Sequence, residues 1–197
     1  MTIDLSDPTT VLIEASRALE RAGLQSAAFG GLALAMYGQP RETKDADLAV
    51  TDIELASAES AFRDAALNVL RAFDRVTFGG LFVSRLTLIG GIAGSLNTVD
   101  LVEPRSSRYA SEVLVRALDT SLRNQPLRVV SPEDFVILKV LATRDRDLED
   151  ARTILSALAA QLDFELIEHE LQRLAGEISD YDFLSRWHKV RSTSPKN

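Results

Sequence analysis

One stretch near the N-terminus constrains the fold more than any other part of the chain. A short apolar run at 27–29 leads into Gly30-Gly31, and helix-forming residues follow over 32–37. Gly and Pro break this pattern at 38–41, and residues 45–50 then have the composition of a strand. The stretch therefore predicts a strand, a glycine turn, a helix and a second strand in close succession.

This stretch also carries residues suited to chemistry. A helix N-terminus offers unpaired N–H groups to an anion, and two glycines let a phosphate approach the backbone closely, which favours Gly30-Gly31 as a phosphate-binding turn. Asp45 and Asp47 are two residues apart on the expected strand, so their side chains project from the same face. Adjacent carboxylates repel each other unless they share a cation, and Mg²⁺ is a natural partner for such a pair.

The spacing of these residues resembles a known motif. Gly-Gly, thirteen intervening residues and Asp-x-Asp are similar to the motif of the DNA polymerase β-like nucleotidyltransferase superfamily. Within it, Arg41-x-Thr43-x-Asp45-x-Asp47 resembles the AbiEii-type toxins. A second match begins at Ser131-Pro-Glu-Asp134 and continues through Lys139 to an Arg-Asp-rich box containing Arg144, Arg146, Asp147 and Asp150. The resemblance spans about residues 27–155.

The resemblance implies a metal-dependent transfer of a nucleoside monophosphate from an NTP. Asp45, Asp47 and Asp100 would hold Mg²⁺ (or Mn²⁺), with Asp100 also orienting or deprotonating the attacking hydroxyl. Gly30 and Gly31 would cradle the phosphates, and Lys139 would neutralise the triphosphate. Further nucleotide contacts are expected from Arg41, Thr43, Arg144, Arg146 and Asp147. The implied acceptor is an RNA 3′ end such as that of tRNA, and the implied partner is a cognate antitoxin.

The residues themselves leave structural alternatives open at three places. Asp100 lies in a strand-like run at 98–102, where a single acid can also protect a sheet edge. Lys139 on a largely apolar helix face requires either an anion or a route for its amine to solvent. The alternating Arg and Asp residues over 144–150 could form a salt-bridge network that clamps the helical part to the sheet.

Composition narrows the remaining possibilities. The chain has 197 residues, enough for one compact domain with a small helical appendage, and a net charge of −7, which argues against a general nucleic-acid coat protein. Only residues 104–155 carry a basic excess, nine Lys and Arg against eight Asp and Glu. The absence of cysteine excludes disulfides and thiolate metal sites. No run approaches the length of a membrane span, and the acidic start does not resemble a signal peptide, so we expect a cytoplasmic protein.

Periodicity predicts an α+β fold, a nucleotidyltransferase-type mixed sheet flanked by helices with a C-terminal helical part. We expect a core at 1–127 and a helical subdomain at 128–197. Helices are expected at the following ranges: 7–22, 32–37, 53–73 (as one or two), 112–122, from 132 onward, 151–162, 164–174 and 181–190. Strands are expected at 27–29, 45–50, 76–78, 82–89, 98–102 and 127–130. Turns are expected at Gly79-Gly80, Gly90-Gly91 and Gly94-Ser95.

Two other functions remain open at this level. A protein of the same fold that binds nucleotides without turnover would act as a regulatory module, although it would have little reason to keep three carboxylates. A nucleotidyltransferase that modifies a small molecule, such as an antibiotic, would keep the chemistry and change the acceptor.

Overall fold

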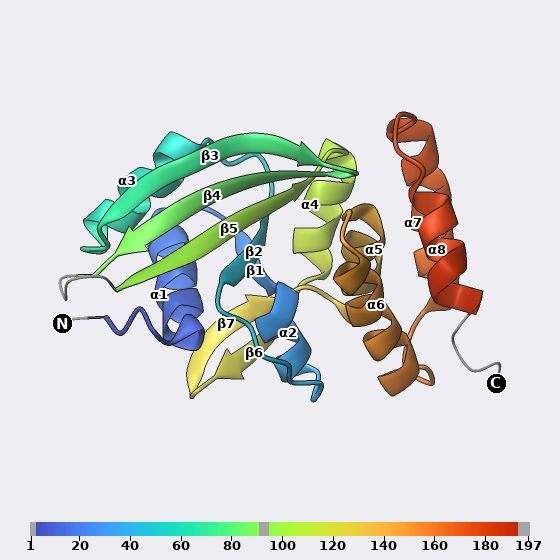
Figure 1. Cartoon of the computed structure of the whole chain (residues 1–197), viewed down its shortest axis with the longest axis horizontal. Coiled ribbons are helices and arrows are strands. Elements are labelled where there is room, and N and C mark those ends of the chain that lie inside the picture. Colours follow the sequence, from blue (N-terminus) through green and yellow to red (C-terminus); the bar gives the residue numbers. More distant parts are fainter. Residues whose placement is uncertain (1–2, 91–94, 193–197) are drawn as a thin grey trace.

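A seven-stranded mixed sheet forms the centre of the molecule (Figure 1). The computed structural model describes residues 3–90 and 95–192. The strand order is β3-β4-β5-β2-β1-β7-β6, with β2 parallel to β5, β1 parallel to β7, and the other neighbours antiparallel. The strands are β1 (Ser26–Phe29), β2 (Ala46–Val50), β3 (Val69–Phe78), β4 (Leu81–Ile89), β5 (Leu96–Pro104), β6 (Leu118–Leu122) and β7 (Gln125–Val129).

Helices flank this sheet and continue beyond it. The helices are α1 (Pro8–Arg21), α2 (Gly30–Met36), α3 (Leu55–Asp64), α4 (Ser107–Arg116), α5 (Pro132–Leu141), α6 (Asp145–Ala157), α7 (Phe164–Glu177) and α8 (Phe183–Ser192). Helices α1 and α3 contact each other and the sheet, whereas α5–α8 gather at one end of the molecule (Figure 1). The predicted α+β class, with a mixed sheet and a helical C-terminal part, is confirmed. The boundary expected near residue 127 stays a prediction.

Local signals explain why several elements begin where they do. The Asp7 carboxylate accepts a hydrogen bond of 3.1 Å from the Thr9 N–H, and Pro8 occupies the first turn of α1. Ser131 caps α5 in the same way, with its hydroxyl accepting from the Asp134 N–H at 3.1 Å. Both helix starts were readable in the sequence because they depend on neighbouring residues alone.

The helix expected over 53–73 is wrong in its second half. Helix α3 ends at Asp64, Ala66 adopts a left-handed conformation with φ 60°, and β3 begins at Val69. The apolar residues of this segment fit either period. Residues 69–78 form a strand because they pair with β4 along its length. This strand includes residues 76–78, which were expected to be a strand. The turn predicted at Gly79-Gly80 is confirmed as the link between β3 and β4.

The helix expected over 112–122 is also displaced. Ser106 caps α4, which therefore covers 107–116, and the last five predicted helical residues form β6 instead. Arg123 and Asn124, both with positive φ, make the tight turn into β7. Helix α6 likewise begins and ends earlier than the expected 151–162. Of the glycine turns expected between 90 and 95, residues 91–94 lie outside the described part of the chain.

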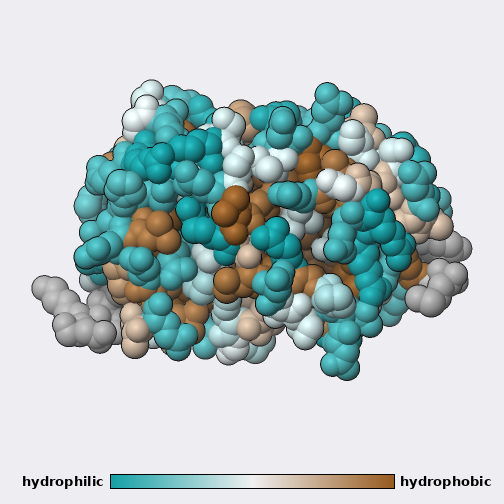
Figure 2. Space-filling model, turned by 180° about the vertical axis from the view of Figure 1, so that it is seen from behind, coloured by the Kyte–Doolittle hydropathy of each residue, from teal (hydrophilic) through white to brown (hydrophobic). Residues whose placement is uncertain are grey.

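Within residues 3–90 and 95–192, no helix is both long enough and apolar enough to cross a bilayer. Figure 2 shows one face of the molecule, which is largely hydrophilic. Its hydrophobic residues form small separate groups rather than one continuous area. The hydrophobic core instead lies between the sheet and its helices and continues among α5–α8.

Candidate active site

Three carboxylates meet where β2 and β5 lie side by side. Asp47 on β2 is in register with Asp100 on β5, so both side chains leave the same row of the sheet. Asp45 precedes β2 by one residue and shares the face of Asp47. One oxygen from each of Asp45, Asp47 and Asp100 lies within 4.8 Å of the others. The sequence therefore identified three acids that the fold brings together from positions 55 residues apart along the chain.

The row continues on both sides of the acids. Arg85 on β4 is in register with Asp100 and donates two hydrogen bonds to its carboxylate, at 2.6 and 2.7 Å. Phe29, the last residue of β1, is in register with Asp47. Arg85 was not predicted from the sequence, because its partner depends on the register between β4 and β5, for which no local sequence signal was found.

The electrostatics of this cluster favour a bound cation. Burial and the neighbouring charges of Asp45 and Asp100 raise the pKa of Asp47 to about 7, although Lys139 and Arg144 partly oppose that rise. The donor set consists only of carboxylate oxygens, the ligands that Mg²⁺ and Mn²⁺ prefer. These residues therefore fit a divalent metal ion, which would remove the repulsion among them.

Gly30 lies directly against the cluster. It opens α2 with φ +66°, and a Cβ there would stand 1.8 Å from the Asp47 Oδ2 atom. A Cβ on Gly31 would stand 2.8 Å from the Thr43 Cβ and 3.0 Å from the Arg41 Nη1. The glycine pair is thus required for the close packing of the turn against the strand that bears the acids. Its predicted contact with phosphate stays a prediction.

The second half of the sequence motif forms a buried chain of ion pairs. The Lys139 amine, 2% exposed, contacts Asp147 at 3.0 Å and Asp150 at 2.9 Å. Arg41 forms two hydrogen bonds with Asp150, at 2.8 and 2.9 Å, which link the segment before β2 to α6. Arg144 contacts Asp147 from the other side at 3.3 Å. This is the salt-bridge alternative that the sequence left open.

The ion pairs bear on the predicted nucleotide-binding roles. Burial opposes ionisation of Asp147, but the charges of Lys139 and Arg144 hold its pKa below the usual value. The Lys139 amine also faces the rings of Phe29 and Phe135, at 5.0 and 5.6 Å from their centroids. A contact between Lys139 and a triphosphate would have to compete with these partners, so that role stays a prediction.

Thr43 and Arg146 occupy the rim near Asp45. The Thr43 hydroxyl donates to Asp45 Oδ1 at 2.9 Å, which orients that carboxylate. Arg146 donates to the Glu42 carbonyl oxygen at 3.3 Å. Both positions suit the orientation of the loop before β2, and nucleotide contact from either residue stays a prediction.

Two cavities meet at Asp47, Arg144 and Asp147. The polar lobe, of about 360 Å³, contains most of the basic side chains and has Asp45 in its wall. The apolar lobe, of about 160 Å³, has Asp100 and Arg85 in its wall together with aromatic and aliphatic side chains of β3, β4 and β5. The polar lobe is lined by Arg41, Glu42, Thr43, Lys44, Asp45 and Arg146 in addition to the three shared residues.

Solved structures share this fold at low sequence identity. The antibiotic-resistance factor ANT(2'')-Ia is 14% identical, with a TM-score of 0.51 over 93% of this chain and 95% of its own. An antigenic nucleotidyltransferase-like protein from Paracoccidioides brasiliensis is 16% identical, with a TM-score of 0.52 over 100% of this chain and 97% of its own. At these identities the likeness shows the fold alone. Among curated proteins, none matches the sequence.

A match to a family of sequences assigns the protein to a family, which the shared fold alone does not. Residues 9–184 match the family described as "Nucleotidyl transferase of unknown function (DUF2204)". The matched range includes the glycine turn, the three carboxylates and the Lys139 ion-pair chain. Because the match covers most of the sequence, the chain belongs to this family of nucleotidyl transferases.

Proposed function

We propose that the protein transfers a nucleoside monophosphate from an NTP to a hydroxyl group in a reaction that depends on Mg²⁺ or Mn²⁺. The observation that carries this proposal is the meeting of Asp45, Asp47 and Asp100 within 4.8 Å, beside the Gly30 turn. Two neighbouring strands hold two of these acids in register, so the cluster is built into the sheet. Such preorganisation is what phosphoryl-transfer catalysis requires, since positioning and electrostatics supply most of its rate.

The chain's own residues divide the work. Asp45, Asp47 and Asp100 would hold the divalent ion, which when bound neutralises charge that develops on the transferred phosphoryl group. The basic side chains of the polar lobe attract the triphosphate, and Gly30 and Gly31 allow its close approach. Asp100 accepts the proton of the attacking hydroxyl or orients that group. Lys139 fixes Asp147 and Asp150, and through them Arg144 and Arg41.

The resemblance to AbiEii-type proteins adds finer elements to the proposal. These are an RNA 3′ end such as that of tRNA as one candidate acceptor, a toxic activity in the cytoplasm, and a cognate antitoxin that restrains it. A small hydroxyl compound, such as an antibiotic, is the competing acceptor. Expression of the wild type should arrest growth, whereas expression of the Asp45→Ala/Asp47→Ala variant should not. This result would support the toxin role.

A label-transfer experiment tests the activity. The purified protein is incubated with each α-³²P NTP, Mg²⁺, and either total RNA or a set of small hydroxyl compounds. The Asp45→Ala/Asp47→Ala variant should lose transfer, whereas Asp64→Ala, which removes an exposed carboxylate at the end of α3, should retain it. Transfer by the Asp45→Ala/Asp47→Ala variant at the wild-type rate would refute the assignment of the carboxylates.

A further inference from the structure

The apolar lobe beside Asp100 has the size of one ring. Its volume is about 160 Å³, and its apolar wall consists of Phe29, Phe73, Phe78, Leu81, Val83, Val102 and Ala142. An apolar cavity of roughly 150 Å³ accommodates one benzene molecule. The lobe can therefore take one planar or apolar ring-sized group, and it does not enclose a linked series of sugar rings.

The charges that face the lobe do not favour a cationic ligand. Two of its three carboxylates already form ion pairs, Asp100 with Arg85 and Asp147 with Lys139 and Arg144. Recognition of an aminoglycoside requires several carboxylates free to pair with its amines. A bound divalent ion would occupy Asp47 and Asp100, which leaves no carboxylate of the lobe free for that purpose. A group without amines fits these surroundings better.

Aromatic packing holds one wall of the lobe in place. The rings of Phe73 and Phe78 lie 6.4 Å apart at their centroids with a 49° tilt, and the Arg85 guanidinium is 5.5 Å from the centre of the Phe73 ring. Arg85 thus joins the aromatic wall to Asp100. A ring placed against this wall brings its hydroxyl close to the carboxylate cluster.

The distribution of the carboxylates sets the direction of attack. Asp45 lines only the polar lobe, Asp100 lines only the apolar lobe, and Asp47 lines both. In an in-line displacement the attacking oxygen and the leaving oxygen lie on opposite sides of the phosphorus. If the polar lobe, whose wall includes the side chains of Arg41, Lys44 and Arg146, holds the leaving pyrophosphate, the hydroxyl enters from the apolar lobe.

We propose, on the basis of the function proposed above, that the acceptor is a small uncharged molecule whose hydroxyl is carried on or next to a single planar or apolar ring. The acceptor oxygen forms a bond to the α-phosphorus and the bond between that phosphorus and the α–β bridging oxygen breaks. Pyrophosphate leaves with the bonding electron pair, and the hydroxyl proton passes to Asp100. The net charge of −7 disfavours RNA as the carrier of that ring.

Benzyl alcohol is a suitable probe, with tobramycin and a short RNA oligonucleotide as competitors. Binding is measured by saturation-transfer NMR in the presence of Mg²⁺ and a non-hydrolysable NTP analogue. Val83→Trp fills the lobe from β4, and Val115→Trp, at a position that is 81% exposed on α4, is the matched control. Phe78→Ala removes part of the wall at a position that is 40% exposed, so it should preserve the fold.

We expect saturation transfer to benzyl alcohol with the wild type and Val115→Trp, loss of the signal with Val83→Trp, and about five- to tenfold weaker binding with Phe78→Ala. All four proteins should keep the same rise in melting temperature with Mg²⁺ and NTP.

Loss of that rise in Val83→Trp alone would assign the lobe to the nucleotide and overturn the proposal. Binding of tobramycin or RNA in the lobe, without benzyl alcohol, would also overturn it. A wild type that gains no stability from Mg²⁺ and NTP would instead contradict the proposed function itself.

Discussion

At the scale of single residues, Gly30 illustrates how closely the turn and the acids fit. The glycine pair predicted a turn between a strand and a helix, whereas the positive φ of Gly30 and its approach to Asp47 could come only from the packed structure. The pairing of Arg85 with Asp100 had no comparable local signal. Residues that act through their immediate neighbours were thus predictable, and those that act across strands were not.

Gly30→Ala should abolish nucleotide-induced stabilisation. The new Cβ would stand 1.8 Å from Asp47 Oδ2 and displace that carboxylate, beyond the cost of about 1–2 kcal/mol for a left-handed alanine. Gly38→Ala is the control, since Gly38 has φ +75° and no atom within 4 Å of the added methyl. Thermal melts with and without Mg²⁺ and NTP measure the difference. Equal nucleotide responses in the two variants would contradict the steric argument.

Asp147→Asn should lower the free energy of unfolding by roughly 3 kcal/mol near neutral pH, since it removes one partner of a buried pair while Asp150 still contacts Lys139. The pKa of Asp147 is depressed in the folded state, so its stabilising effect is present above the usual pKa of 3.8 and declines as pH falls through the folded value. The difference between wild type and variant should therefore shrink in acid. Urea titrations at pH 7 and below pH 4 test this, with Asp119→Asn, whose side chain is 97% exposed, as control.

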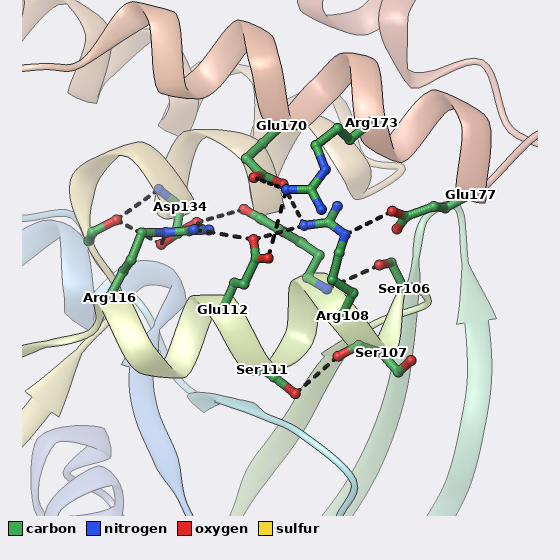
Figure 3. A network of polar contacts seen from close by, with 12 residues as sticks. Ser106, Ser107, Arg108, Ser111, Glu112, Arg116, Asp134, Glu170, Arg173 and Glu177 are labelled. Atoms are coloured by element: carbon green, nitrogen blue, oxygen red, sulfur yellow. Dashed lines mark hydrogen bonds and ion pairs between the residues drawn. The ribbon is translucent and has the colours of Figure 1, made fainter.

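At the scale of elements, a polar network joins α4 to the C-terminal helices (Figure 3). Arg108 on α4 contacts Glu170 at 2.9 Å and Glu177 at 2.8 Å, both on α7, and Glu112 at 2.8 Å on its own helix. Arg116, about two turns further along α4, forms two hydrogen bonds with the fully buried Asp134 on α5. Asp134 was predicted as a motif residue in the first turn of a helix. Its partner Arg116 was not predicted, because it lay in the helix expected at 112–122, which the structure places at 107–116.

Arg108→Ala should loosen α7 selectively. Glu170 is 2% exposed, and loss of Arg108 would leave Arg173, at 3.2 Å, as its ion-pair partner within the described ranges 3–90 and 95–192. We expect a destabilisation of about 3 kcal/mol and faster hydrogen exchange in α7 than in β2 or β5. Arg21→Ala, on the exposed end of α1, should change neither. Uniformly faster exchange across the sheet and α7 would contradict a local role for the network.

At the scale of the whole molecule, the site lies where the sheet meets the α5–α6 helices, so ligand binding should stabilise both together. A ligand at 100 times its dissociation constant adds about 2.7 kcal/mol, which for a domain of this size raises the melting temperature by roughly 5–10 °C. We expect that rise with Mg²⁺ and the preferred NTP, its reversal by EDTA, and its absence in the Asp45→Ala/Asp47→Ala variant. A single cooperative transition before and after addition would show that the sheet and helices respond as one unit.

The fold class followed from the sequence because the strand, glycine turn and second strand are encoded by adjacent residues. The course of residues 69–73 did not, since apolar residues there suit a helix and a strand equally and only pairing with β4 distinguishes them. Asp45 and Asp47 were predicted as a pair for the same reason, whereas Asp100 was expected beside them from the resemblance to a known family. The two lobes of the site could not be predicted, because their walls come from strands and helices far apart along the chain.

The most direct test of the carboxylate centre is a crystal structure with Mn²⁺ and a non-hydrolysable NTP, in which anomalous scattering locates the metal ions. The account predicts a metal peak bonded to oxygens of Asp45, Asp47 and Asp100 at about 2.1 Å, with the triphosphate over the Gly30 turn. A bound nucleotide without metal at these three carboxylates, or a metal peak elsewhere on the molecule, would contradict it.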